Sequence, residues 1–347
     1  MGTKLKELIE GKEIELEDLS GRTIVIDGMN QLYQFLTIIR QPDGTPFTDK
    51  DGNVTSHLMG LFYRLTNFIE NNIKMVYVFD GKHPELKGAE IEIRKERKEE
   101  ARIKYEKAKK EEDTEAMKKY ATMTAQLTKD MVIQAKELLD AFGIPWIDAL
   151  SEGESQAVHI VNKNQAYAVV SQDYDSLLFG AKRMIKNLSI SGKRKRMGKA
   201  GYKIIKPELI DLKENLDRLK INNDQLILIA ILVGTDFNPG GIKGIGQNKA
   251  LALIKKHEKE KNFNKMCEKI FKDVKWGETY SSLSWKEIFD LFKNMPIKEK
   301  YDIEQKQMDA KKVEKLLLDY GFSKERVESA LKKIQKKEQK GLGEFFK

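Results

Sequence analysis

The sequence predicts an α/β fold with a mostly parallel central sheet flanked by helices. Three short runs of β-branched and aromatic residues lead to acidic residues: Thr23–Asp27, Met75–Asp80 and Ala166–Val170, the last followed by Asp173. Near-continuous apolar runs of this length are typical of strands buried on both faces. Longer segments with helical periodicity separate the runs and predict the covering helices. Because ligands bind at the carboxyl ends of strands in such sheets, three strand ends are expected to bring acids to one place.

The composition changes after Asp80. From Leu86 to Tyr120 the chain is rich in Lys, Glu and Arg and has few large apolar residues. A helix that is polar nearly all round is exposed, bridges other parts of a structure or becomes ordered only on binding. An apolar stripe returns in Lys129–Phe142. We therefore interpret the charged stretch, about residues 82–128, as an insertion into the fold.

The second half of the chain begins with a basic segment that contains a glycine. This segment, Ser191–Arg196, is predicted to be a loop before a strand at Tyr202–Ile205. The apolar helix Gln225–Val233 then leads to Gly234-Thr235-Asp236, and the rest has helical patterning. A single domain over residues 1–330 is predicted.

Charge and composition indicate which kinds of partner and cellular compartment to expect. Charged residues make up 34% of the 347 residues, and the net charge is +9. A basic excess favours a polyanionic partner, because neutralised phosphates release counterions; a solvated surface of the thermophile type explains it about equally well. The single cysteine, Cys267, suits a reducing compartment. No apolar run reaches the roughly 18 residues that a bilayer requires, so we expect an intracellular protein with no membrane partner.

Seven acidic residues are candidate metal ligands. They follow predicted strands or flank predicted helices: Asp27, Asp80, Glu152, Glu154, Asp173, Asp175 and Asp236. Two carboxylates about 4 Å apart repel by roughly 4 kcal/mol at an effective dielectric of about 20, so a cluster requires protonation or bound cations. Oxygen ligands without His or Cys pairs indicate Mg²⁺ or Mn²⁺ rather than zinc. Two such ions about 4 Å apart can activate water and stabilise the leaving oxygen of a phosphodiester.

Each acid taken alone also has a plain structural explanation. Glu154 can favour a helix N-terminus, Asp175 can cap a helix and Asp236 can serve a turn. Asp173 and Asp175 share one face only if the backbone between them is extended. We interpret the nearby His83 as a hydrogen-bonded surface or structural residue rather than as a ligand. The convergence of the acids is what favours a metal site.

Several of these segments resemble the motifs of flap endonucleases. The matching segments, in chain order, are Ile26–Asn30, Val78–Gly81, Glu152–Ala157, Gln172–Gly180 and Gly234–Phe237. The resemblance covers nearly the whole chain, favours the archaeal branch and is closer to flap endonucleases than to the larger excision-repair nuclease of the same superfamily. It implies a structure-specific, metal-dependent nuclease that hydrolyses a phosphodiester near the base of a 5′ flap, with 5′–3′ exonuclease activity, in Okazaki-fragment maturation and DNA repair.

The resemblance also implies roles for single residues. The first four acids of the set would serve one Mg²⁺ and the last three a second, with Mn²⁺ as the alternative ion. Lys87 and Arg94 match basic residues at the base of a helical arch, formed by the charged insertion, that would steer the phosphate toward the metals. With Asp27 and Asp80 they are the implied catalytic residues. Tyr33 matches an aromatic residue that stacks on a base near the scissile phosphate. Without the family match, Lys87 and Arg94 would be interpreted as solvated surface charge.

A glycine-rich segment, Gly241–Ala250, resembles the turn of a helix-hairpin-helix type region at about residues 224–257. Gly244 and Gly246 would expose backbone N–H groups to a phosphate at a helix start, and Lys249 adds positive charge. The family implies that this region grips duplex DNA and binds a monovalent cation, K⁺ or Na⁺. A plain helical hairpin is the alternative.

The lysine-rich tail, residues 331–347, is expected to be flexible until bound. It resembles a sliding-clamp-binding box whose specified positions are Gln339, Leu342, Phe345 and Phe346. The last three would form one apolar face in a short helical turn; a C-terminal turn packed on its own domain is the alternative. The implied partners are 5′-flap DNA and the clamp, for a protein that is monomeric alone. It would be cytoplasmic in an archaeon and nuclear in a eukaryote.

Two other functions agree with parts of the sequence. Val25–Gly28 superficially resembles the strand end of a phosphatase with an aspartyl nucleophile, but that reaction needs a second acid where Met29 stands. A DNA-junction or clamp-binding scaffold would share the basic surfaces. Such a scaffold has no use for seven acids, since near DNA phosphates they weaken binding unless metals are present.

Overall fold

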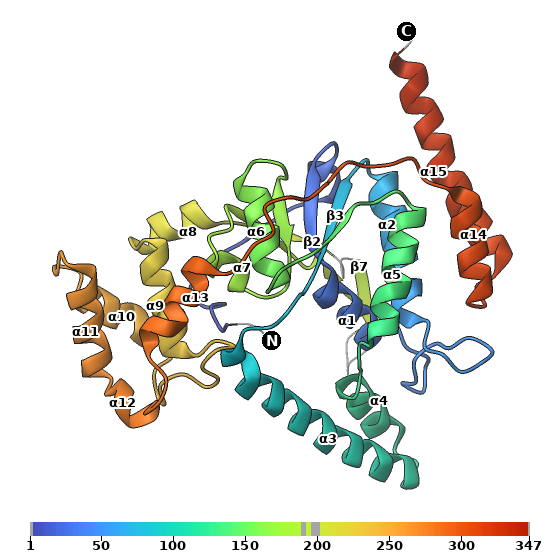
Figure 1. Ribbon diagram of the computed structural model, residues 1–347. Coiled ribbons are helices and arrows are strands. Elements are labelled where there is room, and N and C mark those ends of the chain that lie inside the picture. The colour runs from blue at the N-terminus through green and yellow to red at the C-terminus, as the bar shows by residue number, and fades with distance from the viewer. Residues whose placement is uncertain (1–2, 189–191, 196–201, 346–347) are drawn as a thin grey trace. The chain divides into compact units, whose positions relative to one another are not determined.

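The computed structural model describes residues 3–188, 192–195 and 202–345. The chain divides into two compact units, each of which contains strands and helices (Figure 1). Unit 1 comprises Met1–Ile14, Asp80–Arg94 and Ala149–Glu299, and unit 2 comprises Glu15–Phe79, Lys95–Asp148 and Lys300–Lys347. The organisation of residues 1–330 as a single domain stays a prediction.

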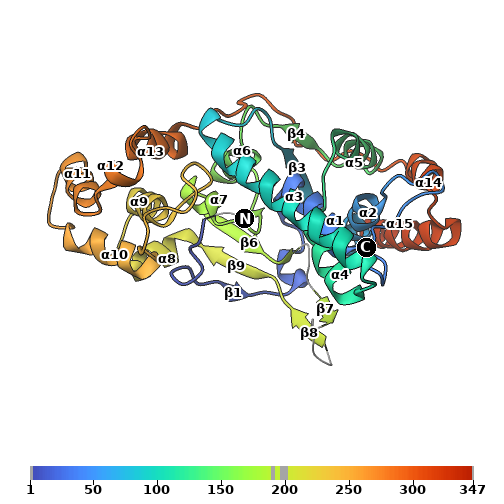
Figure 2. The ribbon, with the colours of Figure 1, turned by 90° about the horizontal axis from the view of Figure 1, so that it is seen from below.

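Unit 1 contains the neighbouring strands β1-β9-β6-β5, in that order. Their bounds are Lys12–Glu13 for β1, Ala168–Val170 for β5, Arg183–Lys186 for β6 and Glu208–Asp211 for β9. β5 and β6 are parallel, whereas β9 runs antiparallel to β6 and to β1, beside which it lies in Figure 2. The predicted strand at Ala166–Val170 is thus present but shorter, and it is buried throughout.

The basic segment predicted as a loop, Ser191–Arg196, contains a strand. β7 (Gly192–Lys195) pairs antiparallel with β8 (Tyr202–Ile205), the strand predicted from the sequence. Pairing with β8 satisfies backbone N–H and C=O groups of this stretch, and this stabilises the extended conformation of a segment rich in Lys and Arg. Ser191 and Arg196 themselves lie outside the described residues.

One helix of unit 1 is apolar all round and buried. α9 (Asn223–Val233) confirms the predicted helix and begins with a capping box between Asn222 and Gln225. Its residues Leu226–Leu232 are all buried, as expected for a helix that is apolar all round. The other helices of the unit are α6 (Gly153–Asn162), α7 (Asp175–Leu178), α8 (Leu212–Leu219), α10 (Gln247–Lys256), α11 (Phe263–Asp273), α12 (Trp276–Thr279), α13 (Trp285–Asn294) and the 3-10 helix η2 (Glu85–Lys87).

Unit 2 contains the neighbouring parallel strands β2-β3-β4. β2 (Thr23–Asp27) and β3 (Lys74–Phe79) confirm the two strands predicted here, and β4 is Trp146–Asp148. Ile24, Val25 and Ile26 of β2 have no exposed surface, so both faces of this strand are covered. The predicted α/β class with mostly parallel strands is confirmed. The exceptions are β9, which runs antiparallel to both β6 and β1, and the separate antiparallel pair of β7 and β8.

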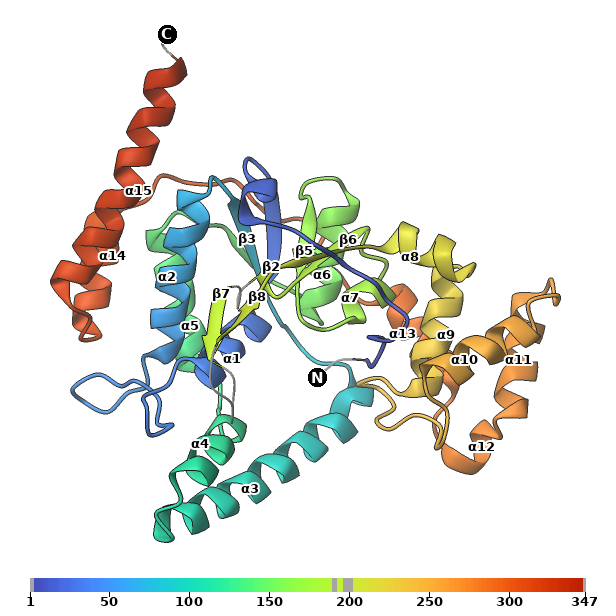
Figure 3. The ribbon, with the colours of Figure 1, turned by 180° about the vertical axis from the view of Figure 1, so that it is seen from behind.

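Four helices of unit 2 pack together, with α15 and α5 beside α2 and α14 beside α5 (Figure 3). The helices of this unit are α1 (Gly28–Ile38), α2 (Ser56–Glu70), α4 (Thr114–Met123), α5 (Lys129–Ala141), α14 (Ala310–Asp319), α15 (Lys324–Phe345) and the 3-10 helix η1 (Leu16–Leu19). In the described part of the chain no helix is both long and apolar enough to cross a membrane.

The charged insertion is helical. α3 (Gly88–Lys110) begins in unit 1 and ends in unit 2, and α4 follows it. Its 23 residues have no clear apolar stripe, and Ala101 and Ala108 are its buried hydrophobic residues. Lys, Glu, Arg and Ala are strong helix formers, so composition alone favours a helix where periodicity gives no signal.

The backbone of the tail is helical further than predicted. α15 extends to Phe345 and so includes most of the segment expected to be flexible, residues 331–347. The run of Lys, Glu and Gln after Ile334 favours helix by intrinsic propensity. Gln339, Leu342 and Phe345 lie on this helix, but their side chains, and the whole of Phe346, lie outside the described structure.

Candidate active site

Six of the seven predicted acids belong to unit 1, and Asp27 belongs to unit 2. Those of unit 1 lie at the ends of strands and helices. Asp80 follows β3, Glu152 precedes α6 and Glu154 lies in its first turn, Asp173 follows β5, Asp175 begins α7 and Asp236 follows α9. Asp80, Glu152, Asp173 and Asp236 thus lie just outside the regular elements, whereas Glu154 and Asp175 lie in the first turns of their helices.

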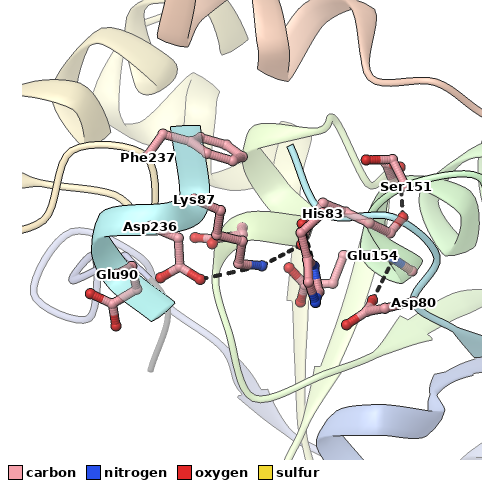
Figure 4. Close-up of polar contacts among 12 residues, drawn as sticks. Asp80, His83, Lys87, Glu90, Ser151, Glu154, Asp236 and Phe237 are labelled. Atoms are coloured by element: carbon pink, nitrogen blue, oxygen red, sulfur yellow. Dashed lines mark hydrogen bonds and ion pairs between the residues drawn. The ribbon is translucent and has the colours of Figure 1, made fainter. Parts of the chain in front are cut away.

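Lys87 lies at the centre of a charge network in unit 1, and Figure 4 shows its ammonium group directed toward Asp236. Its Nζ lies 2.5 Å from Glu152 Oε2 and 3.5 Å from Asp236 Oδ2. The side chain is only 11% exposed, so its interpretation as solvated surface charge is wrong. Burial disfavours the charged form, but the neighbouring carboxylates outweigh burial and raise the pKa of Lys87. Lys87 therefore remains positively charged among the acids.

Arg94 extends this network from the second turn of α3. Its guanidinium donates to Asp236 Oδ2 at 2.7 Å and, through Nε, to Glu90 Oε1 at 2.8 Å. Burial opposes the charge of Arg94, but Asp236 and Glu90 together raise its pKa. Asp236 therefore interacts with two cations, one buried and one half-exposed, that both come from the segment around the start of α3.

Glu152 is held from two sides. His83 Nδ1 lies 3.2 Å from Glu152 Oε1, and Lys87 binds the other carboxylate oxygen. Burial acts to raise the pKa of Glu152, but the hydrogen bond from His83 and the charge of Lys87 lower it below the ordinary value. The hydrogen bond to Glu152 raises the pKa of His83. His83 is thus hydrogen-bonded, as expected from the sequence.

Asp80 lies at the end of β3, where the backbone passes close to residues 149–153. Its Oδ1 accepts a hydrogen bond from Gly153 N at 2.7 Å. Burial, and then the nearby Glu152, raise the pKa of Asp80. A Cβ at Gly81 would lie 2.1 Å from Ala149 O, so no larger residue could follow Asp80 without displacing the backbone. The close approach of the Ala149–Leu150 backbone therefore explains this glycine.

Glu154 is oriented by two hydroxyl groups that the sequence analysis missed. Its Oε1 accepts from Ser171 Oγ at 2.6 Å and from Ser176 Oγ at 3.1 Å. Ser171 also accepts from the backbone N–H of Asp173 at 3.1 Å. Ser176 lies inside the motif Gln172–Gly180 and Ser171 directly precedes it, but no spacing rule connects either serine with Glu154. Their role is visible only once α6 and α7 are folded together.

Asp175 is an acid without a cation to compensate it in the described contacts. It is 9% exposed, and burial, followed by the negative charges of Asp236 and Asp173, raises its pKa to about 6. The backbone N–H of Thr3 donates to its Oδ1 at 3.0 Å. The backbone from Asp173 to Asp175 is not an extended strand, because β5 ends at Val170 and α7 begins at Asp175. The two acids nevertheless lie close enough to repel.

Replacing Asp175 with Asn is expected to stabilise the protein in the absence of divalent metal. Asn keeps an oxygen that accepts from Thr3 but carries no charge. Because the folded-state pKa of about 6 exceeds the ordinary 3.8, stability falls as the pH rises between these values. Above that window the ionised Asp175 carboxylate lowers the free energy of unfolding by about 3 kcal/mol, since each pKa unit corresponds to about 1.4 kcal/mol. Thermal unfolding in EDTA near neutral pH should show a higher midpoint for Asp175→Asn.

Below the window, at a pH of about 3, the midpoints of Asp175→Asn and the wild type should coincide, because both forms are then neutral at this position. Asp217→Asn, at an exposed position of α8, is the matched control and should unfold with the wild-type midpoint at both pH values. Equal midpoints for all three proteins near neutral pH would contradict the charge repulsion at Asp175.

The donor set agrees with a divalent metal in chemistry, although the ligands are not preassembled. Among the described residues, no three His, Cys, Asp or Glu side chains form a ready chelating group. Two of the expected ligands, Glu152 and Asp236, are engaged by Lys87 and Arg94. The repulsion at Asp175 is of the kind that a hard cation relieves. A metal at Glu152 or Asp236 would therefore compete with side-chain cations of the protein itself.

Two predicted residues belong to unit 2. Asp27 is 8% exposed and caps α1, accepting from the backbone N–H of Asn30 at 3.0 Å. Its carboxylate thus has a structural task at the start of this helix. Tyr33 lies on α1 and is 41% exposed, which is unusual for so large an aromatic residue in a helix that otherwise buries Leu32, Phe35 and Leu36. An exposed ring of this kind can accept a stacked base.

The glycine-rich turn in unit 1 leads directly into α10. Gly246 is the N-cap of α10 and has no side chain. The backbone N–H groups of the first turn of α10 are therefore not capped by this residue. Gly244 has a φ of +80°, and a Cβ at Gly244 or Gly246 would meet nothing within 4 Å. Both glycines therefore face open space. Lys249 Nζ donates to Gly244 O at 3.0 Å, which places a positive charge beside the turn.

The turn before these glycines is fixed by hydrogen bonds around Asp236. Asn238 is fully buried; its Oδ1 accepts from Thr235 N and Oγ1 at 3.2 and 2.7 Å, and its Nδ2 donates to Ile231 O at 2.8 Å. A Cβ at Gly234 would lie 2.6 Å from the backbone of Gly241. The loop that carries Asp236 is thus closed by contact between its own backbone segments.

Comparison with known proteins places the chain in a family. The XPG N-terminal domain matches residues 2–101 and the XPG I-region matches residues 143–236. Flap endonuclease 1 of Staphylothermus marinus is 50% identical over 341 residues, or 97% of this chain and 95% of the relative. That of Aeropyrum pernix is 47% identical over 340 residues, with the same shares covered. The solved flap endonuclease-1 from Methanococcus jannaschii is 39% identical and has a TM-score of 0.73, over 96% of this chain and 98% of its own. The chain therefore belongs to the flap endonuclease family of the 5′-nuclease superfamily, whose members are metal-dependent phosphodiester hydrolases of DNA replication and repair.

Proposed function

We propose that this chain is a structure-specific DNA nuclease that hydrolyses a phosphodiester near the base of 5′ flaps and has 5′–3′ exonuclease activity. The observation that carries the proposal is the placement of Lys87 and Arg94 directly against Glu152 and Asp236. Cations that already contact the acids of the site are positioned to bind a phosphate as it arrives there. Family membership supports roles in Okazaki-fragment maturation and DNA repair.

Two Mg²⁺ ions, or Mn²⁺ in their place, are the proposed cofactors. Asp80, Glu152 and Glu154 are the unit-1 residues proposed for the first ion, and Asp173, Asp175 and Asp236 those for the second. Asp27 stays a prediction from the family motif. When bound, the ions supply an activated water and stabilise the leaving oxygen. Lys87 and Arg94 would transfer their contacts from carboxylate to the scissile phosphate and so hold it in position.

Duplex binding is proposed at the turn before α10. The open faces of Gly244 and Gly246 let a DNA backbone approach, and Lys249 adds charge for a phosphate. A K⁺ or Na⁺ ion at this turn is part of the proposal through the family resemblance. Tyr33 is proposed to stack on the base next to the cleaved bond. As an enzyme of branched DNA, the protein would act inside the cell, as a monomer when alone.

A cleavage assay tests this function. A double-flap DNA labelled at the 5′ end of the flap should give one major product whose length equals the flap plus at most a few nucleotides, with Mg²⁺ and not with EDTA. A 3′-flap DNA of the same length is the matched control and should remain uncut. Flap-specific binding with no product under any Mg²⁺ or Mn²⁺ concentration would instead favour the non-enzymatic scaffold.

The C-terminal box is proposed to bind a DNA sliding clamp. Replacing Phe345 and Phe346 with Ala should weaken clamp binding about 100-fold or more, because paired aromatic anchors commonly carry most of the binding energy of such an interface. Calorimetric titration with the purified clamp measures the loss. Cleavage without the clamp should stay at the wild-type rate.

The matched control for the box replaces two lysines of the same tail, Lys336 and Lys337, with Ala. This variant should bind the clamp nearly as well as the wild type, since neither lysine is a specified position of the box. Equal affinities for the wild type and the Phe345/Phe346 double variant would remove the clamp assignment.

A further inference from the structure

The N-terminal segment Thr3–Glu10 is part of the acid site of unit 1 although it lies far from it in the sequence. Thr3 is 3% exposed, and its backbone N–H donates to Asp175 Oδ1 at 3.0 Å. The two residues are separated by 172 positions. The backbone N–H of Thr3 is the donor to Asp175, since the buried Thr3 hydroxyl has no hydrogen-bond partner of its own among the described residues.

The segment is anchored in the apolar core just beyond Thr3. Leu5, Leu8 and Ile9 are buried and belong to the hydrophobic core cluster that also contains Leu177 and Leu178 of α7. α7 is the helix that begins with Asp175. The donor and the acceptor of the hydrogen bond are therefore mounted on elements that pack in the same core, so their separation is fixed by packing on both sides.

Polar contacts fix the segment at two further points. The backbone N–H of Glu7 donates to Gln247 Oε1, on the first residue of α10, at 2.8 Å. The side chain of Asn215 on α8 accepts from Glu10 N at 2.8 Å and donates to Glu10 O at 2.9 Å. An amide that binds both backbone groups of one residue allows that residue little freedom. The chain from Thr3 to Glu10 is thus held along its length rather than at one end.

We propose that Thr3 is a positioning residue whose backbone N–H sets the orientation of the Asp175 carboxylate for metal binding, with Thr3–Glu10 as the brace that holds this N–H in place. This rests on the proposed function, because it takes Asp175 as a metal ligand. A carboxylate that must share an ion with Asp173 and Asp236 gains from having one oxygen fixed by a donor, since partners of this kind commonly contribute 10- to 100-fold, roughly, to metal affinity.

The N–H can be removed without touching any charged group. Thr3→Pro lacks the N–H, and Thr3→Val has nearly the shape of Thr and keeps it. Both variants lack the hydroxyl group, so the difference between them reports the backbone donor. The readout is calorimetric titration of the full-length, DNA-free protein with Mn²⁺ as the probe ion, together with the unfolding midpoint of each variant in EDTA.

Thr3→Pro is expected to bind Mn²⁺ about tenfold more weakly than Thr3→Val, whose affinity should match the wild type. In an Asp175→Asn background the two Thr3 variants should bind equally, because the ligand that the N–H orients is already altered. Equal Mn²⁺ affinities for Thr3→Pro and Thr3→Val, with Asp175→Asn weaker than both, would overturn the positioning role and leave the metal assignment intact. Wild-type Mn²⁺ affinity in Asp175→Asn would instead overturn the proposed metal ligand.

A proline that distorts the segment would lower the unfolding midpoint in EDTA as well as the affinity. Leu5→Ala therefore serves as a second variant, because it loosens the core anchor of the brace and keeps the N–H of Thr3. Its Mn²⁺ affinity should fall between those of Thr3→Val and Thr3→Pro. Cys267→Ala, which trims an equally buried side chain of the same core cluster away from the brace, should keep wild-type affinity. Equal affinities for Leu5→Ala and Cys267→Ala would contradict the brace.

Discussion

Replacing Asp173 with Ala should reduce Mg²⁺-dependent flap cleavage about 1000-fold or more at saturating enzyme, which corresponds to about 4 kcal/mol of transition-state stabilisation. Asp173 lies close enough to Asp175 to raise the pKa of that buried acid, so the two are placed to share one ion. Removing it eliminates a ligand and one negative charge. Single-turnover cleavage of a labelled double flap across Mg²⁺ concentrations measures the effect.

Binding of the flap by Asp173→Ala should remain, because the proposed DNA contacts at Tyr33, the glycine turn and Lys249 are unchanged. In Ca²⁺ the affinity should equal or exceed that of the wild type, since one negative charge near the phosphate is gone. Asp217→Ala, at an exposed position of α8, is the control for loss of a carboxylate and should cleave normally. Near-normal cleavage by Asp173→Ala at every Mg²⁺ concentration would show that the acidic residues have been misinterpreted.

Replacing Lys87 with Ala should separate metal binding from catalysis. Cleavage at saturating enzyme is expected to fall about 100-fold, because the variant lacks a cation that holds the scissile phosphate. Mg²⁺ affinity should rise, because a metal no longer competes with the ammonium group 2.5 Å from Glu152. Single-turnover kinetics and metal titration of the DNA-free protein give the two quantities independently.

The same Lys87→Ala variant should be less stable in EDTA, by about 3 kcal/mol or more, since removing one partner of a buried ion pair leaves the other charge uncompensated. Adding the Glu152→Gln substitution should restore part of this loss. Lys213→Ala, at an exposed lysine of α8, is the control and should leave cleavage, metal affinity and stability unchanged. If Lys87→Ala bound Mg²⁺ more weakly than the wild type, the proposed competition would be wrong.

The sequence predicted those features that depend on local patterns. β2 and β3 were predictable because their apolar runs are buried on both faces, and α9 because it is apolar all round. β1 and β9 were not, since short strands with exposed or half-buried residues have no such pattern. Residues 331–347 were expected to be flexible because they form a lysine-rich tail, whereas their composition also favours a helix, and most of them belong to α15.

The acids of the site were also predictable, and their surroundings were not. Each acid follows an apolar run or precedes a helix, which is a local signal. No local signal predicts the burial of Lys87, because its neighbours in sequence resemble an exposed charged stretch. Its partner Glu152 lies 65 positions away. Ser176 and Thr3 are likewise ordinary residues in the sequence. Long-range partners of this kind become identifiable only from the folded chain.

Because Lys87 forms an ion pair with Glu152, the part of the site around Glu152 contains its own counterion. Chelating agents that strip divalent metals would therefore not leave bare negative charge at Glu152. The described contacts of Asp175, by contrast, include neighbouring acids and the Thr3 N–H but no cation. A DNA phosphate that draws Lys87 toward itself would at the same moment release the Glu152 carboxylate. Substrate binding would thereby free the Glu152 carboxylate to bind a metal ion.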